Sequence, residues 1–130
     1  MGTAAQAAEV IALAESYSRQ PTTELYWMLE ATWAEARGVA PVPVHGLSGF
    51  WADLHRSLVE RIVANKDAGS ATLGYVTAQV LDELQAMGLD LHAYRISIAI
   101  FVAIVWQSAC KALERSARGS KDEPDDGYST

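Results

Sequence analysis

Cysteine is almost absent from this chain, with Cys110 as the only one in 130 residues. A single thiol excludes an internal disulfide framework, and no Cys/His spacing typical of a zinc site occurs. A helical metal site needs a second histidine or an acid three or four residues from the first, and His45, His55 and His92 each lack one. We therefore predict no metal and no cofactor, and the cysteine content fits a reducing, cytoplasmic compartment.

Positive charge is also scarce. Ten basic residues stand against sixteen acidic ones, so the net charge is −6, and half of it lies after Ser120, where four acids accompany one lysine. No basic patch or basic arm is visible in the chain. Because the neutralisation of phosphates supplies most of the affinity for nucleic acid, this charge pattern argues against a nucleic-acid partner.

The chain lacks a complete catalytic motif. Residues 45–49, HGLSG, contain part of the nucleophile-elbow pattern G-x-S-x-G, but Phe50 stands where the last glycine is required. Ser48 is therefore predicted to cap a helix, and Cys110 is predicted to be a small buried side chain. No glycine-rich phosphate loop and no acid–base pair stand out. We predict that the protein is not an enzyme.

The most informative stretch that is present runs from Ile96 to Trp106, with Ser97 as its only polar residue. A helix that is apolar on all sides is buried on all sides. The alternation of its β-branched residues would also suit a strand. A helix is favoured because Asp90 is a suitable N-cap, the following residues continue a helical pattern, and no second strand of comparable length is available for pairing.

Membrane insertion of the apolar run is an alternative to a core helix. The run is shorter than the roughly 20 residues that span a bilayer, and Arg95 and Lys111 bracket it. The N-terminus also lacks the basic start of a signal peptide, and Glu9 and Glu15 interrupt its apolar part. These features argue against a membrane partner.

Four further segments each have one apolar stripe, as expected of helices that pack around a central one: residues 4–18, 24–37, 49–67 and 72–87. We predict an all-α, single-domain five-helix bundle over residues 1–119, with a central, all-round apolar helix at 91–118. Residues 120–130 are predicted to form an acidic, disordered tail. The connection at 38–49 contains two prolines and either has a function or only covers the core.

Aromatic residues outside the apolar stripes indicate a surface for a partner. Trp27 points away from the main stripe of its helix, alongside Ala31 and Ala34, and Tyr75 lies opposite the stripe of helix 72–87. Tryptophan and tyrosine are favoured anchors of protein interfaces. These four residues form the predicted partner-binding site. The alternative is that the connection 38–49 folds back over Trp27.

A second set of residues would suit a ligand site beside the central helix. Arg95 lies at the mouth of the apolar run, next to Tyr94, and a half-buried arginine needs an acidic or carbonyl partner. It forms either a structural ion pair with Glu83 or Asp82, or an anion anchor in an apolar pocket. In the second case the pocket is expected to involve Trp51, His55, Tyr94 and Arg95.

These observations favour a non-enzymatic protein-interaction module, such as a small regulator, an inhibitor or an immunity-type factor. Its partner is expected to be another protein, a second copy of the chain, or both. The alternative is a helical domain that binds a small apolar ligand in a pocket beside the helix 91–118.

Overall fold

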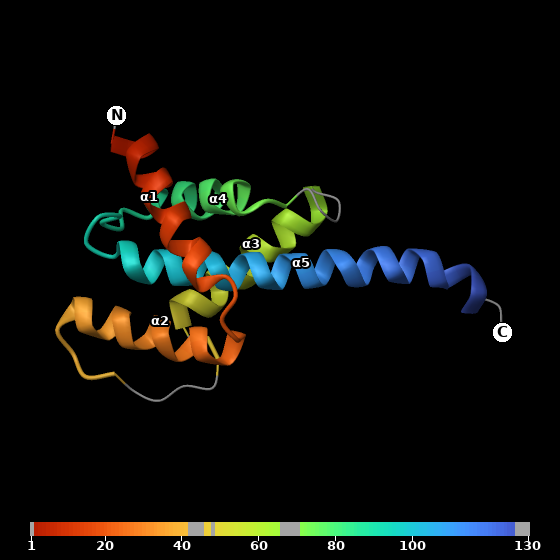
Figure 1. Cartoon of the computed structure of the whole chain (residues 1–130), viewed down its shortest axis with the longest axis horizontal. Helices are drawn as coiled ribbons and strands as arrows, with labels where there is room; N and C mark the ends of the chain where they lie inside the picture. Colours follow the sequence, from red (N-terminus) through yellow and green to blue (C-terminus); the bar gives the residue numbers. More distant parts are fainter. Residues whose placement is uncertain (1, 42–45, 48, 66–70, 127–130) are drawn as a thin grey trace.

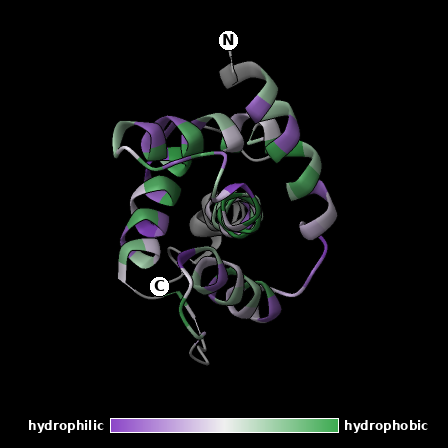
Figure 2. Cartoon of the chain, turned by 90° about the vertical axis from the view of Figure 1, so that its left-hand side faces the viewer, coloured by the Kyte–Doolittle hydropathy of each residue, from purple (hydrophilic) through white to green (hydrophobic). Residues whose placement is uncertain are grey.

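The computed structural model describes residues 2–41, 46–47, 49–65 and 71–126, with side chains for 5–41, 46–47, 49–65 and 71–116. Its helices are α1 (Gly2–Tyr17), α2 (Thr22–Arg37), α3 (Gly49–Asn65), α4 (Leu73–Ala86) and α5 (Arg95–Asp126), and the described part contains no strand. The predicted all-α bundle of five helices is therefore confirmed. Figure 1 shows α5 running through the middle of the molecule, and Figure 2 shows it nearly end-on with the other helices around it.

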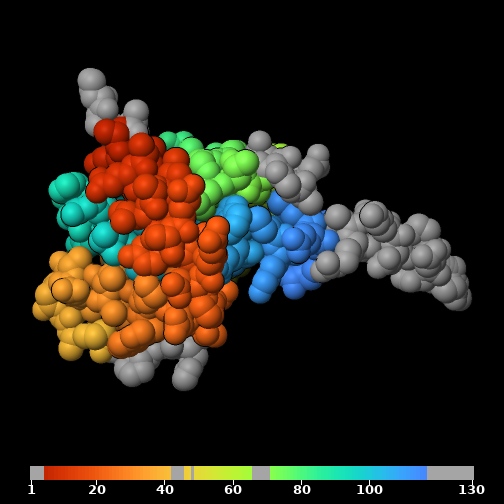
Figure 3. Space-filling model, in the orientation of Figure 1, coloured from red at the N-terminus to blue at the C-terminus, as the bar shows by residue number. Residues whose placement is uncertain are grey.

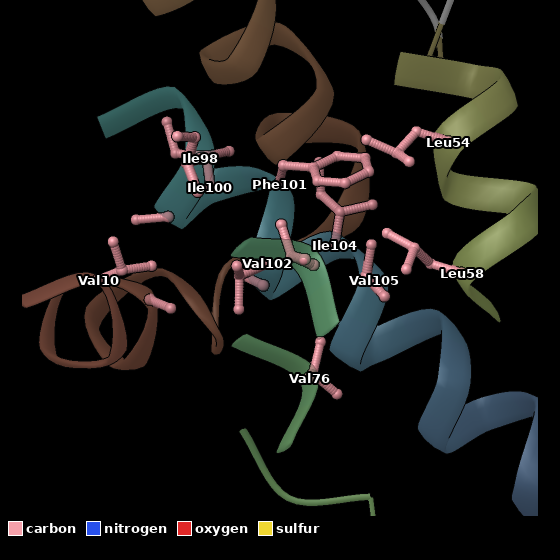
Figure 4. Close-up of a cluster of buried hydrophobic side chains, with 14 of the residues drawn as sticks. Val10, Leu54, Leu58, Val76, Ile98, Ile100, Phe101, Val102, Ile104 and Val105 are labelled. Atoms are coloured by element: carbon pink, nitrogen blue, oxygen red, sulfur yellow. The ribbon is translucent and has the colours of Figure 1, made fainter. Parts of the chain in front are cut away.

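The apolar part of α5 forms the core of the bundle. Every side chain from Ile98 to Val105 is 0% exposed, and α5 contacts each of the other four helices. Figure 4 shows these side chains pointing in different directions: Phe101, Ile104 and Val105 face Leu54 and Leu58 of α3, whereas Val102 lies near Val76 of α4. The burial on all sides follows from the apolar pattern, because no side of this segment carries a polar stripe.

The central position applies to only part of α5. Figure 1 shows its C-terminal part extending beyond the other helices, and Figure 3 shows α1 and α2 covering its middle on the same face. The last buried hydrophobic side chain of α5 in the described part is that of Leu113. The prediction of a central helix buried on all sides therefore holds for residues 97–105 of α5.

The predicted ends of this helix, 91 and 118, differ from the observed ones. Asp90 Oδ1 accepts hydrogen bonds from the backbone N–H groups of His92 and Ala93, at 3.1 and 3.0 Å, so it caps a turn that precedes the helix. At the other end, α5 continues through Gly119 to Asp126. A glycine inside a helix costs only about 0.5–1 kcal/mol and does not by itself end it. Residues 127–130 lie outside the described part.

Three consecutive residues of α5 attach it to three other parts of the chain. Trp106 Nε1 donates to the carbonyl oxygen of Ala71, before α4, at 3.1 Å. The Gln107 side chain binds the connection between α1 and α2. Ser108 Oγ lies 2.8 Å from His55 Nε2 of α3. These three residues directly follow the apolar segment of α5. Because hydrogen bonds are directional, their bonds fix the rotation of α5 relative to its neighbours.

One segment of α5, Arg95–Ser116, is long and apolar enough to cross a membrane by length and composition. It has 22 residues and a mean hydropathy of 1.8. The apolar run of residues 96–106 is only part of this segment. In the structure these side chains pack against four other helices, which accounts for their composition as that of a core helix.

Candidate functional site

The outer face of α2 carries an exposed tryptophan. Trp27 is 43% exposed, whereas Leu25 and Leu29 on the main stripe of the same helix are buried. Ala31 is half-buried. Ala34, however, is only 1% exposed, so its assignment to the partner-binding surface is wrong. The accessible part of this face consists of Trp27 and Ala31, which we call the Trp27 face.

The connection after α2 begins at the C-terminal turn that contains Ala34. Gly38 adopts the left-handed conformation, with φ of 74°, and the N–H of Val39 donates to the carbonyl oxygen of Ala34 at 2.9 Å, as at many helix ends. The chain then returns along the helix, since Gly46 lies beside the ring of Tyr26. Among the described residues the connection lies beside Tyr26, whereas Trp27, which the alternative expected it to cover, stays 43% exposed. Residues 42–45 and 48 lie outside them.

Tyr75 does not join the Trp27 face. It is half-buried and packs against the core from α4. Figure 1 shows α4 and α2 on opposite sides of α5. A single flat partner could not cover both residues, and the predicted four-residue site therefore separates into two places.

The four residues of the alternative ligand site also separate. His55 Nε2 is hydrogen-bonded to Ser108 Oγ, and burial lowers the pKa of His55 below its ordinary value. Arg95 Nε lies 3.2 Å from Glu9 Oε2 of α1. The expected partners of Arg95 on α4 were wrong: Glu83 instead pairs with Arg61 at 3.0 Å. Helical periodicity predicts the side of a helix, but it does not identify the helix that packs there.

Trp51 and Tyr94 do belong to one cluster of aromatic rings, in which both contact Trp33. The Trp33 ring lies at their junction, with centroid distances of 5.1 Å to Trp51 and 4.8 Å to Tyr94. Phe50 stacks on Trp33 at 5.9 Å, and Phe101 lies 4.6 Å from Trp51. Such offset and edge-to-face pairs stabilise a fold by about 0.5–1.5 kcal/mol each beyond area burial. No pattern in the sequence predicts this cluster.

A surface groove of about 520 Å³ opens onto the cluster. Trp33, Phe50 and Trp51 form its aromatic lining, with Glu30 and Arg37 among its other residues. The Arg37 guanidinium lies 5.4 Å from the centre of the Trp33 ring, within the range of a cation–π interaction. Trp51 Nε1 is buried and has no hydrogen-bond partner in the described part of the chain. We call this depression the aromatic groove.

A smaller groove of about 190 Å³ lies between α2 and the start of α5. Its lining consists of Thr32, Glu35, Ala36, Ala93, Tyr94, Ile96 and Ser97. Thr32 Oγ1 and Ser97 Oγ lie 2.9 Å apart. Ser97 is the only polar residue of the apolar run, which was a signal for this site, but the partner that it meets 65 positions away could not be read from the sequence. We call this depression the α2–α5 groove.

Two observations on the described residues concern metal binding and nucleophilic chemistry. No three histidine, cysteine or acidic side chains among them lie close enough to hold a metal ion. Burial, and then the charge of Glu114, raises the pKa of the Cys110 thiol, which disfavours the reactive thiolate. His45 and Ser48 lie outside the described residues. The geometry offers surfaces and grooves for binding.

Comparisons with protein-family models, with curated proteins and with solved structures find no match to this chain.

Proposed function

We propose that this protein is a non-enzymatic interaction module that binds another protein, or a second copy of itself, through the Trp27 face. The observation that supports this proposal is the 43% exposure of Trp27 on a helix whose main apolar stripe is already buried. Trp27 therefore contributes little to holding α2 in place, and its large apolar surface is available to a partner. Tryptophan is among the residues that most often dominate binding energy at interfaces.

The neighbouring residues suit close contact with a partner. Ala31 lies one turn after Trp27 and is small, so a partner helix could approach the backbone of α2 beside the tryptophan ring. Val39, just beyond the C-terminus of α2, is another large hydrophobic residue that is exposed. A small regulator or inhibitor that acts by surface complementarity needs such an anchor and no catalytic group.

The test compares Trp27→Ala with Met87→Ala, because Met87 is 53% exposed at the end of α4 and serves as a matched control. We expect concentration-dependent association in sedimentation equilibrium, weakened by ~2 kcal/mol or more in Trp27→Ala and unchanged in Met87→Ala. If the wild-type chain stays monomeric, a photo-crosslinker at position 27 should capture a partner protein that the same group at position 87 does not.

Denaturant unfolding separates this proposal from a structural role of Trp27. The monomer of Trp27→Ala should lose little stability, because Leu25 and Leu29 still bury the main stripe. If the connection after α2 instead needs the ring for packing, the substitution opens a cavity and should cost ~3–5 kcal/mol. Unchanged sedimentation together with such a loss would end the case for an interface at Trp27.

A second candidate function is the binding of a small apolar ligand in the aromatic groove. Trp51 lines this groove, and its buried Nε1 has no hydrogen-bond partner among the described residues. Because buried N–H groups in folded proteins nearly always have one, this favours an apolar ligand that also carries one acceptor atom. The volume of the groove, about 520 Å³, is within the range of small-molecule sites. Native mass spectrometry of the purified protein should then show a bound compound that the Phe50→Ala variant loses.

A further inference from the structure

The hydroxyl groups of the α2–α5 groove, from Thr32 and Ser97, are available to a ligand only as hydrogen-bond acceptors. The Thr32 hydroxyl donates to the carbonyl oxygen of Leu29 at 3.2 Å, so Ser97 is left to donate its proton to Thr32 Oγ1 across 2.9 Å. Both hydroxyl protons are then used, since each hydroxyl has only one. The oxygen of Ser97 keeps unused acceptor capacity although the residue is only 1% exposed. The groove therefore offers hydrogen-bond acceptors at its base.

The charge at the groove also favours a ligand that donates hydrogen bonds, and specifically a cation. Glu35 lines the groove, and its carboxylate makes no ion pair or hydrogen bond with the described residues. No basic side chain is among the lining residues. Arg95, which is next to Ile96 in the chain, is held instead by Glu9 at 3.2 Å and by the carbonyl oxygen of His92 at 3.0 Å. A cation that enters the groove thus meets a free carboxylate.

The volume and the apolar lining of the groove indicate which kind of cation would fit. A volume of about 190 Å³ is below the roughly 300–1,000 Å³ of sites for whole small molecules, and it suits one long side chain. Ala36, Ala93 and Ile96 provide apolar contacts for a methylene chain, and the Tyr94 ring provides an aromatic wall for a cation. A lysine side chain combines an aliphatic stem with a three-donor ammonium head and no acceptor.

We propose that the α2–α5 groove receives a lysine side chain of the partner protein, with its ammonium group between the Glu35 carboxylate and the hydroxyl oxygens of Ser97 and Thr32. This inference rests on the proposed function, because it supplies a specificity element for a partner that covers α2. Glu35 lies two turns after Trp27 on the same helix, with Ala31 between them. One partner surface can therefore contact the Trp27 face and insert a lysine into the groove.

The experiment uses chemical probes of the side chain and needs no partner. Nα-acetyl-lysine methylamide is titrated into the isotope-labelled full chain, and amide shifts are followed by NMR. We expect saturable millimolar binding with shifts confined to the groove, such as those of Ala36 and Ser97. Nα-acetyl-norleucine methylamide, which has the stem but no ammonium group, should bind about fivefold more weakly, as expected for loss of a partly exposed ion pair.

Two variants test the two parts of the site. Glu35→Gln should weaken binding of the lysine probe by about fivefold and Ala36→Leu should abolish it by filling the groove, whereas Glu24→Gln on the same helix should bind normally. Glu35, Ala36 and Glu24 are all exposed, so these variants should keep the fold. Equal binding of the lysine and norleucine probes, or no change in Glu35→Gln, would overturn the proposal.

A third probe separates a protein side chain from a free amine. The n-butylammonium ion carries the same head and stem without a peptide backbone, and the lysine probe should bind at least as well. Binding of n-butylammonium alone would overturn the docking of a lysine side chain. These results do not depend on the sedimentation of Trp27→Ala, so a failure at the groove and a failure at the Trp27 face can be told apart.

Discussion

Gln107 Oε1 lies 2.8 Å from Thr22 Oγ1, although the two residues are 85 positions apart in the sequence. The same amide donates from Nε2 to the carbonyl oxygens of Ser18 and Gln20, at 2.9 Å each. One side chain of α5 therefore satisfies two backbone carbonyls and one hydroxyl where the chain passes from α1 to α2. This arrangement fixes the start of α2, the helix that carries Trp27.

Replacement of Gln107 by leucine should show the contribution of these hydrogen bonds. The substitution keeps the approximate size of the side chain and leaves two carbonyl oxygens without their donor, so we expect a loss of ~1–3 kcal/mol in the free energy of unfolding. Urea unfolding measures it. Gln85→Leu on the exposed side of α4 is the control and should change stability by less than about 0.5 kcal/mol. Equal effects of the two would show that the Gln107 hydrogen bonds contribute nothing.

Ile100→Asp should prevent folding. Ile100 is 0% exposed in the middle of the apolar part of α5, and an unpaired charge there should cost several kcal/mol, against the ~5–15 kcal/mol that stabilises a typical domain. We expect insoluble or unfolded protein, as measured by solubility and circular dichroism. Ile96→Asp on the same helix should remain folded, because Ile96 is only half-buried. A soluble, helical Ile100→Asp protein would contradict the central role of α5.

The stability of the fold should fall in mild acid because of His55. Burial lowers the pKa of His55 in the folded state from its ordinary value of 6.5, so the unfolded chain binds the proton more readily. The contribution of neutral His55 to the stability is therefore fully present above pH 6.5. It is lost as the pH falls from 6.5 through the lower pKa of the folded state. Urea unfolding between about pH 7.5 and pH 5.5 should show this loss. His55→Gln should be less dependent on pH in this range, and an unchanged dependence would contradict the assignment to His55.

Deletion of residues 120–130 should leave the melting temperature nearly unchanged. This acidic segment has too little apolar surface to contribute to the core, even though α5 continues as a helix to Asp126. A longer deletion, from Leu113 onwards, is the matched control and should destabilise the bundle because it also removes a buried leucine. A drop of many degrees with the shorter deletion would show that the acidic segment packs against the bundle.

The fold was predictable because its main determinant is local. The run from Ile96 to Trp106 leaves no side of a helix for water, and the four other segments each have one apolar stripe. The ends of α5 were less predictable. Asp90 caps a turn before the helix and does not cap the helix itself, and both arrangements use the same residue type in the same place.

The candidate site depended on contacts between distant segments, and these could not be predicted. Ala34 lies on the same side of its helix as Trp27, yet it is 1% exposed whereas Trp27 is 43% exposed. Arg95 meets Glu9 on α1, 86 positions earlier, and no local pattern favours that partner over an acid on α4. The hydrogen bond between Thr32 and Ser97 could not be predicted either. A hydroxyl within an apolar run shows that a partner is needed, but it does not identify that partner.

The position of α5 in the chain has a consequence for synthesis. All four preceding helices pack on α5, so none of their apolar stripes is fully covered until the ribosome has released α5. Domains of most proteins begin to fold from the N-terminus as the chain emerges. Here the apolar surfaces that face α5 stay exposed on the nascent chain until α5 has been translated, although α4 also contacts α1 and α3. Chains that stop before α5 therefore lack the core helix of this bundle.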